Sequence, residues 1–396
     1  MSFDITQRFR SGLPVADPPP PPAPQFSFVG GHNDADSVPF TGLAEAAVSV
    51  LRRQGPLLAT YSLGGSPLGY RPLRDFVSNT LAARAQTPCD PDDVLIVSGS
   101  LQALDLVNGV LLERGDTVIV EEATYGGMLS RLARLGVNVV GVALDRDGIR
   151  MDHLEELLSR LAAEGTTPKY IYTIPTVQNP TGSVMPVGRR HELLALARRY
   201  GVIIFEDDCY ADLLWAGARP PTIRSLDAGE RGGQVVYCGS FSKSIAPALR
   251  VGYLVADPAM LHQMLALKTD AGSGGLEQMV VAEYAAAHFE PHVAKLSGVL
   301  RAKCEVMMDA VRDGFGDAVS FLVPKGGIFL WLNFPDGTNT SAFVAPAAAA
   351  GIEFNPGAGW SADATWGSCR MRLCFGHPTH ETIREGVAAL AQLMRA

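Results

Sequence analysis

Short apolar runs alternate with helical patterns from about residue 94 onward, and this alternation constrains the fold more than any other feature of the chain. Such alternation is typical of βαβ units stacked into a mostly parallel sheet. Strands are predicted at residues 94–99, 117–122, 137–144, 169–175, 201–208, 234–240 and 251–257. Several of them are nearly continuous in Val and Ile, so helices should cover both faces of the sheet.

The connection between the last two predicted strands is too short for a crossover helix. Only residues 241–250 separate them, whereas a parallel crossover needs about a dozen residues or more. We therefore expect the seventh strand to run antiparallel, which makes the sheet mixed. Helices are predicted at residues 153–164, with Asp152 and Glu155 as a capping box, and at residues 187–200.

The chain divides into three regions by composition and pattern. Residues 1–25 contain the consecutive prolines 18–22 and are expected to form an extended arm. Residues 26–290 hold the predicted sheet and form the large domain. After a long helical stretch that reaches about residue 312, short strands are expected near residues 326–334 and 369–375. Residues 291–396 are therefore expected to form a smaller α+β domain.

Composition excludes several classes of protein. Hydrophobic residues make up 47% and charged residues 19%, the balance of a globular protein. The formal charge of −8 argues against a nucleic-acid surface. We expect no signal peptide, no membrane span and no metal site, because the sequence has no apolar run of the needed length, no HExxH and no CxxC. The six scattered cysteines are expected to be reduced, and the protein cytoplasmic.

Two loops at predicted strand ends could bind an anion or a polar ring. The turn Ser98-Gly99-Ser100-Leu101-Gln102 ends a strand and opens a helix, where free backbone N–H groups can bind phosphate. Such turns often carry Gly and Ser only as caps. Asn179, in a loop that continues Pro180-Thr181-Gly182, could donate its amide to a phenolate-like oxygen, or it could belong to an ordinary turn.

Two further strand ends carry ionisable side chains. Asp207 could hold a pyridine nitrogen protonated, with Tyr210 three residues on, although the same acidic run could bind a metal or cap a helix. Lys243 follows the strand at residues 234–240 and could condense with an aldehyde, although single lysines are more often solvated. Arg250 could bind phosphate or form a salt bridge.

Each of these five groups has both a ligand-binding and a purely structural interpretation. Their order along the chain, with most of them at the carboxyl end of a predicted strand, favours the ligand-binding interpretation. Ligands bind at that edge of such sheets. Over residues 26–390 the sequence resembles fold-type I enzymes that use pyridoxal 5′-phosphate (PLP), specifically the class I/II aminotransferase family and its branch of 2-aminoadipate transaminases and regulator-fused domains. The resemblance implies a seven-stranded sheet sandwiched by helices, with a smaller α+β domain.

The resemblance also implies a role for each matching residue. Lys243 would hold PLP as a Schiff base and act as the general base, Asp207 would pair with the ring nitrogen, and Tyr210 and Asn179 would contact the ring oxygen. The phosphate would be bound by Ser100, Leu101, Gln102, Ser240, Ser242 and Arg250. Tyr125 would stack on the ring, and Tyr61 would reach the phosphate of the partner subunit. Substrate contacts would come from Arg372, which would grip the α-carboxylate, and from Asn179, Gly31, His32 and Tyr70.

Some positions depart from the family pattern. Leu101 stands where a polar residue is common, Ala123 replaces a frequent proline, and Ala248 replaces a usual glycine. None of the three is expected to touch the chemistry directly. The loops around His32 and at residues 357–366 would line the substrate pocket, and their unusual composition leaves the substrate side chain open.

The expected activity is transfer of an amino group between an α-amino acid and a 2-oxo acid by a homodimer with shared active sites. One alternative is an enzyme of the same fold that uses the carbanion for elimination, decarboxylation or carbon–carbon bond formation. A second is a ligand sensor without turnover, although residues 1–25 are too short to supply a DNA-binding domain. A nucleotide-dependent enzyme is excluded, since neither a GxxxxGK[ST] loop nor a GxGxxG turn follows a strand.

Overall fold

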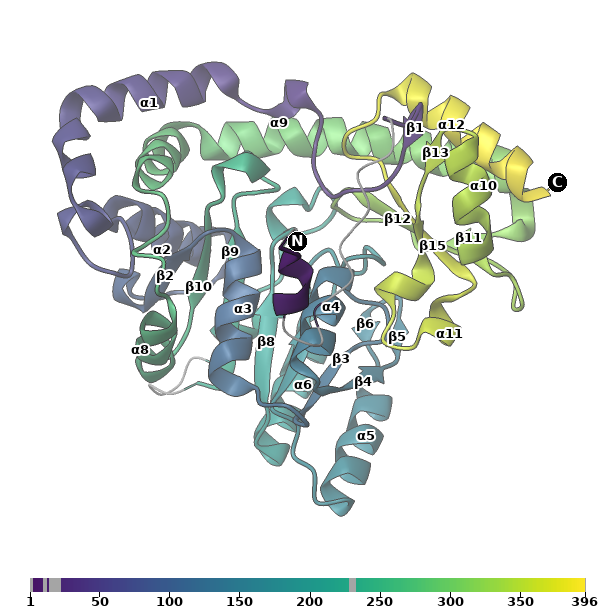
Figure 1. Ribbon diagram of the computed structural model, residues 1–396, viewed down its shortest axis with the longest axis horizontal. Coiled ribbons are helices and arrows are strands. Elements are labelled where there is room, and N and C mark those ends of the chain that lie inside the picture. Colours follow the sequence, from purple (N-terminus) through teal and green to yellow (C-terminus); the bar gives the residue numbers. More distant parts are fainter. Residues whose placement is uncertain (1–2, 10–12, 14–22, 228–232, 396) are drawn as a thin grey trace.

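A seven-stranded sheet forms the centre of the computed structural model, which describes residues 3–9, 13, 23–227 and 233–395 (Figure 1). In spatial order the strands are β2 (Val94–Val97), β10 (Gly252–Val255), β9 (Val235–Ser240), β8 (Ile203–Asp207), β7 (Tyr170–Thr173), β3 (Thr117–Glu121) and β4 (Asn138–Val142). Only β10 runs antiparallel to its neighbours. The seven predicted strands and the antiparallel seventh are therefore confirmed.

Helices cover both faces of the sheet, as the apolar strands require. One face packs on α5 (Met151–Ala163) and α6 (Val187–Tyr200) through inward residues such as Ile119 and Ile171. The opposite face packs on α3 (Ser100–Leu111), α4 (Gly126–Leu135) and α8 (Pro258–Leu267). A separate apolar cluster joins the β2 and β10 edge to α1 (Phe40–Gln54) and α2 (Arg71–Ala85). The short helix α7 (Ile223–Leu226) follows β8.

A second packed body is built around the long helix α9 (Gly275–Phe315), which spans the upper part of Figure 1. A four-stranded sheet lies against it, in the order β11 (Ser320–Phe321), β12 (Phe329–Asn333), β15 (Arg370–Cys374) and β14 (Asn355–Pro356). Its helices are α10 (Val344–Ala349), α11 (Ala364–Gly367) and α12 (His380–Arg395), and α12 packs along α9. The strands expected near residues 326–334 and 369–375 correspond to β12 and β15.

Two short pairs of strands complete the fold. β1 (Phe26–Ser27) pairs in parallel with β13 (Ile352–Glu353), and this pairing attaches the start of the described core to the second body. β5 (Leu144–Asp145) and β6 (Gly148–Ile149) form a hairpin. The domain boundary expected between residues 290 and 291 falls inside α9, so this helix continues from the large region into the small one.

Two sequence predictions about helices need correction. Asp152 does not cap α5: the N-cap is Arg150, no side chain caps that end, and the Asp152 carboxylate pairs with Arg150 instead. The helix therefore begins at Met151, two residues earlier than the capping pattern predicts. The helical stretch after Asp257 is two helices, α8 and α9, separated by the loop at residues 268–274. The helix predicted at residues 187–200 is confirmed as α6.

None of the helices among the described residues is long and apolar enough to cross a membrane. All six cysteines are free thiols. The consecutive prolines of the predicted arm lie outside the described residues.

Candidate active site

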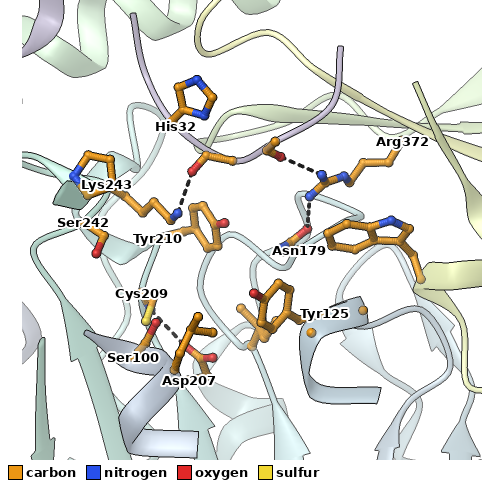
Figure 2. A pocket seen from close by; sticks show the side chains of 18 of the residues that line it. His32, Ser100, Tyr125, Asn179, Asp207, Cys209, Tyr210, Ser242, Lys243 and Arg372 are labelled. Atoms are coloured by element: carbon orange, nitrogen blue, oxygen red, sulfur yellow. Dashed lines mark hydrogen bonds between the residues drawn. The ribbon is translucent and has the colours of Figure 1, made fainter. Parts of the chain in front are cut away.

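Side chains from the carboxyl ends of the strands line a cavity of about 780 Å³ between the two bodies. Figure 2 shows Lys243, Tyr210, Asp207 and Ser100 on one side of it, with Arg372 and Tyr125 opposite. Twelve residues predicted from the sequence line the cavity: Gly31, His32, Ser100, Leu101, Tyr125, Asn179, Asp207, Tyr210, Ser242, Lys243, Arg250 and Arg372. The cavity has the size of an ordinary ligand pocket.

Lys243 projects into the cavity from the segment that follows β9. Its Nζ donates a hydrogen bond to the carbonyl oxygen of Gly31 at 2.5 Å and lies 5.7 Å from the centre of the Tyr210 ring. Burial lowers the pKa of Lys243, because a desolvated ammonium is less stable than one in water. The amine is therefore easier to deprotonate than that of a surface lysine, as nucleophilic and basic roles require.

Asp207 ends β8 and is almost completely buried at the floor of the cavity. Its Oδ2 accepts a hydrogen bond from the Tyr172 hydroxyl at 2.7 Å, and its Oδ1 accepts one from the backbone N–H of Cys209 at 3.2 Å. Burial raises the pKa of Asp207, and the hydrogen bonds oppose that shift. A carboxylate in this setting gains most from a cationic N–H partner in the cavity.

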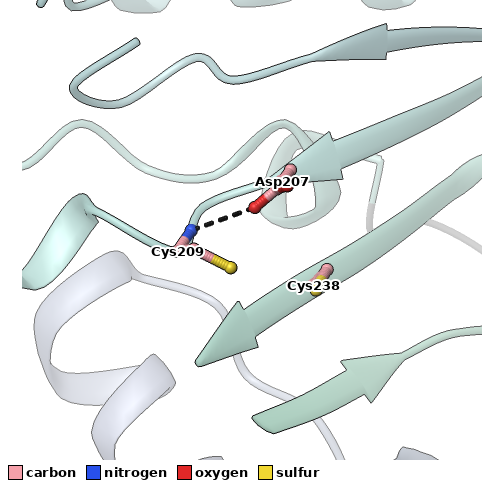
Figure 3. Close-up of side chains that lie close together, drawn as sticks. All are labelled: Asp207, Cys209 and Cys238. Atoms are coloured by element: carbon pink, nitrogen blue, oxygen red, sulfur yellow. Dashed lines mark hydrogen bonds between the residues drawn. The ribbon is translucent and has the colours of Figure 1, made fainter. Parts of the chain in front are cut away.

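The sulfur atoms of Cys209 and Cys238 lie beside Asp207 (Figure 3). One ligand atom of each of the three residues lies within 4.8 Å of the other two, and all three residues are buried. The sequence does not predict this grouping, because Cys238 belongs to β9 and Cys209 follows β8.

A corner of the cavity that could bind an anion forms where α3 begins. Its N-cap, Gly99, has no side chain that could cap the helix. The backbone N–H groups of the first helical residues, Ser100 and Leu101, are therefore not occupied by a side-chain cap. Arg250 lies over this corner, where its Nη2 donates to the Ser98 carbonyl at 3.0 Å. Gly99 has φ +77°, and a Cβ there would come within 2.1 Å of Arg250 Nη2. Glycine is therefore needed for the guanidinium to reach the helix end.

Arg372, on β15, is a buried cation surrounded by neutral oxygen atoms. Its Nη2 donates to the Gly30 carbonyl and to Asn355 Oδ1, both at 2.6 Å, and its Nη1 donates to Asn179 Oδ1 at 3.3 Å. The guanidinium lies 3.4 Å from the centre of the Trp360 ring. No carboxylate pairs with it among the described residues, and its Nε has no partner. Burial lowers its pKa to about 10.

Residues 30–34, which we name the N-terminal strap, run along the cavity, and Gly30, Gly31 and His32 line it. The carbonyls of Gly30 and Gly31 accept from Arg372 and Lys243 respectively. Asn33 Nδ2 donates to the Lys243 carbonyl at 2.8 Å. The strap ends at Asp34, whose carboxylate pairs with Lys303 of α9, so an ion pair holds the strap to the second body.

His32 belongs to the same strap. Its ring stacks on His377, with centroids 4.7 Å apart and planes at 15°. Burial lowers the pKa of both rings, to about 4 for His377, so this stack consists of neutral imidazoles at neutral pH.

Four predicted site residues lie outside this cavity in the described chain. Gln102 Oε1 accepts from Ser98 N, and its Nε2 donates to Asp270 at 2.6 Å. Ser240 Oγ accepts from the backbone N–H of Ser242 at 3.1 Å. Tyr61 and Tyr70 line a second cavity of about 230 Å³.

Of the lining residues that sequence reasoning missed, three contact Arg372: Trp360, Asn355 and Gly30, the last through its carbonyl. Trp360 lies in the loop at residues 357–366 that the sequence marks as unusual, and its ring centre is 5.9 Å from that of Tyr125. A tryptophan in a glycine-rich loop is the one signal that could have identified it.

Together, the fold and this arrangement of side chains define an enzyme that holds a phosphorylated pyridine ring at the carboxyl edge of a mixed α/β sheet. The chain belongs to the aminotransferase class I and II family, whose model matches residues 43–390.

Named relatives agree with this assignment. The chain is 32% identical to aromatic-amino-acid aminotransferase 1 of Thermococcus litoralis, over 93% of this chain and 88% of that protein. A crystal structure of Pyrococcus horikoshii kynurenine aminotransferase with PMP superposes with a TM-score of 0.88, at 32% identity over 93% and 90% of the two chains. For α-aminoadipate aminotransferase from Thermus thermophilus with N-(5′-phosphopyridoxyl)-L-leucine, the TM-score is 0.85, at 33% identity over 93% and 92%.

The protein is therefore a PLP-dependent aminotransferase, and the expectation from the sequence is confirmed. The side chains of the cavity fit PLP: an open helix end beside Arg250 suits a phosphate, buried Asp207 suits a ring nitrogen, and Lys243 suits an aldehyde. Substrates are amino acids and 2-oxo acids, as the family assignment implies.

Proposed function

We propose that Lys243 is the residue that holds PLP covalently and that moves the proton at the substrate Cα. Bound PLP would supply an electron sink for the charge that develops at that carbon. The Lys243 amine lies inside the cavity with a lowered pKa, which supports a role as general base. Asp207 would hold a proton on the ring nitrogen. Tyr210 and Asn179 would donate hydrogen bonds to the ring oxygen, since the Asn179 oxygen already accepts from Arg372.

The phosphate would lie at the start of α3. Ser100, Leu101, Ser242 and Arg250 line that part of the cavity, and they combine backbone N–H groups, two hydroxyls and a guanidinium. Gln102 and Ser240 would act indirectly, because their side chains hold Ser98 and Ser242.

The unpaired guanidinium of Arg372 is the observation that carries the proposal for the substrate. A buried arginine whose partners are all neutral is the natural site for a carboxylate, which would gain two parallel charge-assisted hydrogen bonds. We propose that the α-carboxylate of the amino acid binds there. Gly31 and His32 would then lie beside the substrate.

We further propose an aromatic amino acid as the preferred donor. Beyond Arg372, the wall of the cavity is formed by the rings of Tyr125 and Trp360. Among the described residues that line the cavity, the only lysines and arginines are Lys243, Arg250 and Arg372, and a role is already proposed for each. A second carboxylate on the substrate side chain would therefore lack a cationic partner on this chain. The relatives named for aromatic amino acids and kynurenine support this proposal.

Phenylalanine is expected to react at least about tenfold more efficiently than 2-aminoadipate. The measurement is the half-reaction, in which the PLP form is mixed with one donor and the loss of its visible absorbance is followed. Arg372→Ala should lower the efficiency of the half-reaction by about 10²-fold with either donor. The ratio of the two efficiencies should stay nearly unchanged, because both donors carry the α-carboxylate. Equal or better reaction of 2-aminoadipate would contradict the aromatic preference.

We also propose a homodimer. Apolar side chains are exposed along α1 and the 3-10 helices that follow it, including Phe40 (63%), Leu58 (42%) and Tyr61 (85%). An exposed apolar surface of this kind marks a protein interface. Tyr61 lies outside the cavity of its own chain, which supports a role toward the phosphate of the partner subunit.

The six free thiols support a cytoplasmic location, where cysteines stay reduced.

A mixed dimer of Tyr61→Phe and Lys243→Ala chains tests the shared site. If Tyr61 serves the partner, one site carries both changes and the other carries neither, so the mixed dimer should retain about half of the wild-type activity. If Tyr61 serves its own subunit, each site carries one change and activity falls well below half. The Tyr61→Phe homodimer is the control and must itself be impaired for the comparison to discriminate.

A further inference from the structure

Glu121, the last residue of β3, is a buried carboxylate beside the cavity. Its side chain is 1% exposed. Its Oε1 accepts from the Thr173 hydroxyl at 2.7 Å, its Oε2 accepts from Gln178 Nε2 at 2.9 Å, and the backbone N–H of Ile174 lies 3.3 Å from both oxygens. Each of these partners is a neutral donor. Burial raises the pKa of Glu121 to about 7, and the anionic neighbour Asp207 acts in the same direction.

If Glu121 only stabilised the fold, a buried cation would be expected among its partners. Glu206, the penultimate residue of β8, which β7 separates from β3, is also fully buried, and it faces the buried cation Arg190 at 3.5 Å and two backbone N–H groups. Glu121 pairs with no cation among the described residues. Burying a carboxylate without a counter-ion costs folding free energy. The presence of Glu121 beside the cavity therefore suggests a role in holding the groups to which it is hydrogen-bonded.

Those hydrogen bonds hold Gln178. The Gln178 side chain is 2% exposed, and all of its hydrogen-bonding groups are occupied. Its Nε2 donates to Glu121 and to the Ala123 carbonyl at 2.7 Å, and its Oε1 accepts from the N–H and the hydroxyl of Thr181, both at 2.7 Å. Gln178 therefore joins the segment that leads to Tyr125 with the loop that carries Asn179.

The loop does not adopt this shape by its own preference. Val177, which precedes Gln178, has φ +61°, a left-handed conformation that branched side chains rarely adopt. Its side chain lies against Gly326 and Gly327, where a Cβ would come within 2.6 Å of it. Contacts from outside the loop must therefore hold the loop, and the Glu121–Gln178 hydrogen bond is one of them.

We propose that Glu121 is a positioning residue which, through Gln178, fixes Asn179 and Tyr125 against the cofactor and the substrate carboxylate. This inference rests on the proposed roles of Asn179, Tyr125 and Arg372. Glu121 itself touches neither ligand. Its hydrogen bond to Gln178 sets the position of Asn179, whose oxygen accepts from Arg372, so one contact serves both the cofactor and the substrate.

The test compares Glu121→Leu with Glu121→Gln. Leucine removes both acceptors, whereas glutamine keeps an oxygen for Gln178 and can donate its N–H to the Thr173 hydroxyl. Glu121→Leu should raise the dissociation constant of PLP for the apoenzyme and the KM of the amino acid, each on the order of tenfold, with a smaller change in kcat. Glu121→Gln should restore both to near the wild-type values. The matched control is Glu122→Gln, since the neighbouring Glu122 bonds to Leu144 N on the other side of the strand.

Gln178→Leu provides a second route if Glu121→Leu folds poorly. It should reproduce the loss of PLP affinity, and the double variant should be no worse than either single variant, because both changes break one contact. The proposal is overturned if the leucine variants lower only the thermal midpoint and leave PLP affinity within about twofold. It is also overturned if Glu121→Gln is as impaired as Glu121→Leu, since charge and not position would then matter.

Failure of this inference can be distinguished from failure of the proposed function. If Lys243 and its surroundings were assigned wrongly, wild-type protein would not attach PLP to Lys243. If only the role of Glu121 were wrong, wild-type protein would bind PLP normally and the Glu121 variants would bind it equally well.

Discussion

Lys243→Ala is expected to lower turnover by about 10³-fold or more, because the change removes both the covalent attachment of PLP and the general base. Borohydride treatment of the wild-type protein should fix the cofactor on the peptide that contains Lys243. The matched control is Lys295→Ala, which changes an exposed lysine of α9 and should leave turnover unchanged. Fixation of the cofactor on any other lysine would refute the assignment.

Asp207→Asn is expected to slow removal of the Cα proton on the order of 10³-fold while PLP still binds. The uncharged amide is nearly the same size as the carboxylate but cannot hold a proton on the ring nitrogen, so the ring becomes a poorer electron sink. Wash-out of deuterium from the Cα of the donor measures this step directly. Turnover within about tenfold of wild type would show that Asp207 lacks this role.

Asp208 does not offer an equivalent carboxylate. It pairs with Arg219 at 3.0 Å and also lies within hydrogen-bond distance of the Tyr237 hydroxyl. These contacts hold the Asp208 side chain away from the cavity that Asp207 lines. A defect seen with Asp207→Asn can therefore be attributed to one carboxylate.

The sheet and one wall of the site could be predicted because both depend on regular structure. Runs of Val and Ile identify the strands, and parallel strands bring their carboxyl ends to one edge. Asp207 ends β8, and Lys243 follows β9 closely. The short link at residues 241–250 even gives the reversed direction of β10, since it leaves no room for a crossover helix.

The opposite wall of the site depends on contacts that carry no pattern in the sequence. The Gly30 and Gly31 carbonyls are backbone groups, and every residue has one. Trp360 reaches Arg372 from a loop without periodicity. Arg372 can be identified only through the family resemblance, because nothing in its strand indicates that it faces a cavity formed by another part of the chain.

Capping was the weakest local prediction. Asp152 and Glu155 have the spacing of a capping box, yet α5 begins at Met151 and the Asp152 carboxylate turns to Arg150. A nearby guanidinium offers the carboxylate a stronger partner than a backbone N–H group does. Pattern alone cannot weigh such competing partners.

The N-terminal strap makes substrate binding an exchange reaction. Its carbonyls at Gly30 and Gly31 already satisfy Arg372 and Lys243, at 2.6 and 2.5 Å. If the substrate carboxylate binds Arg372 as proposed and takes the Nη2 position, it replaces the hydrogen bond from Gly30, and its measured affinity is then the difference between two sets of contacts. The strap thus competes with any ligand for Arg372, and a ligand with a negative charge can displace the neutral Gly30 carbonyl more readily than a neutral ligand can.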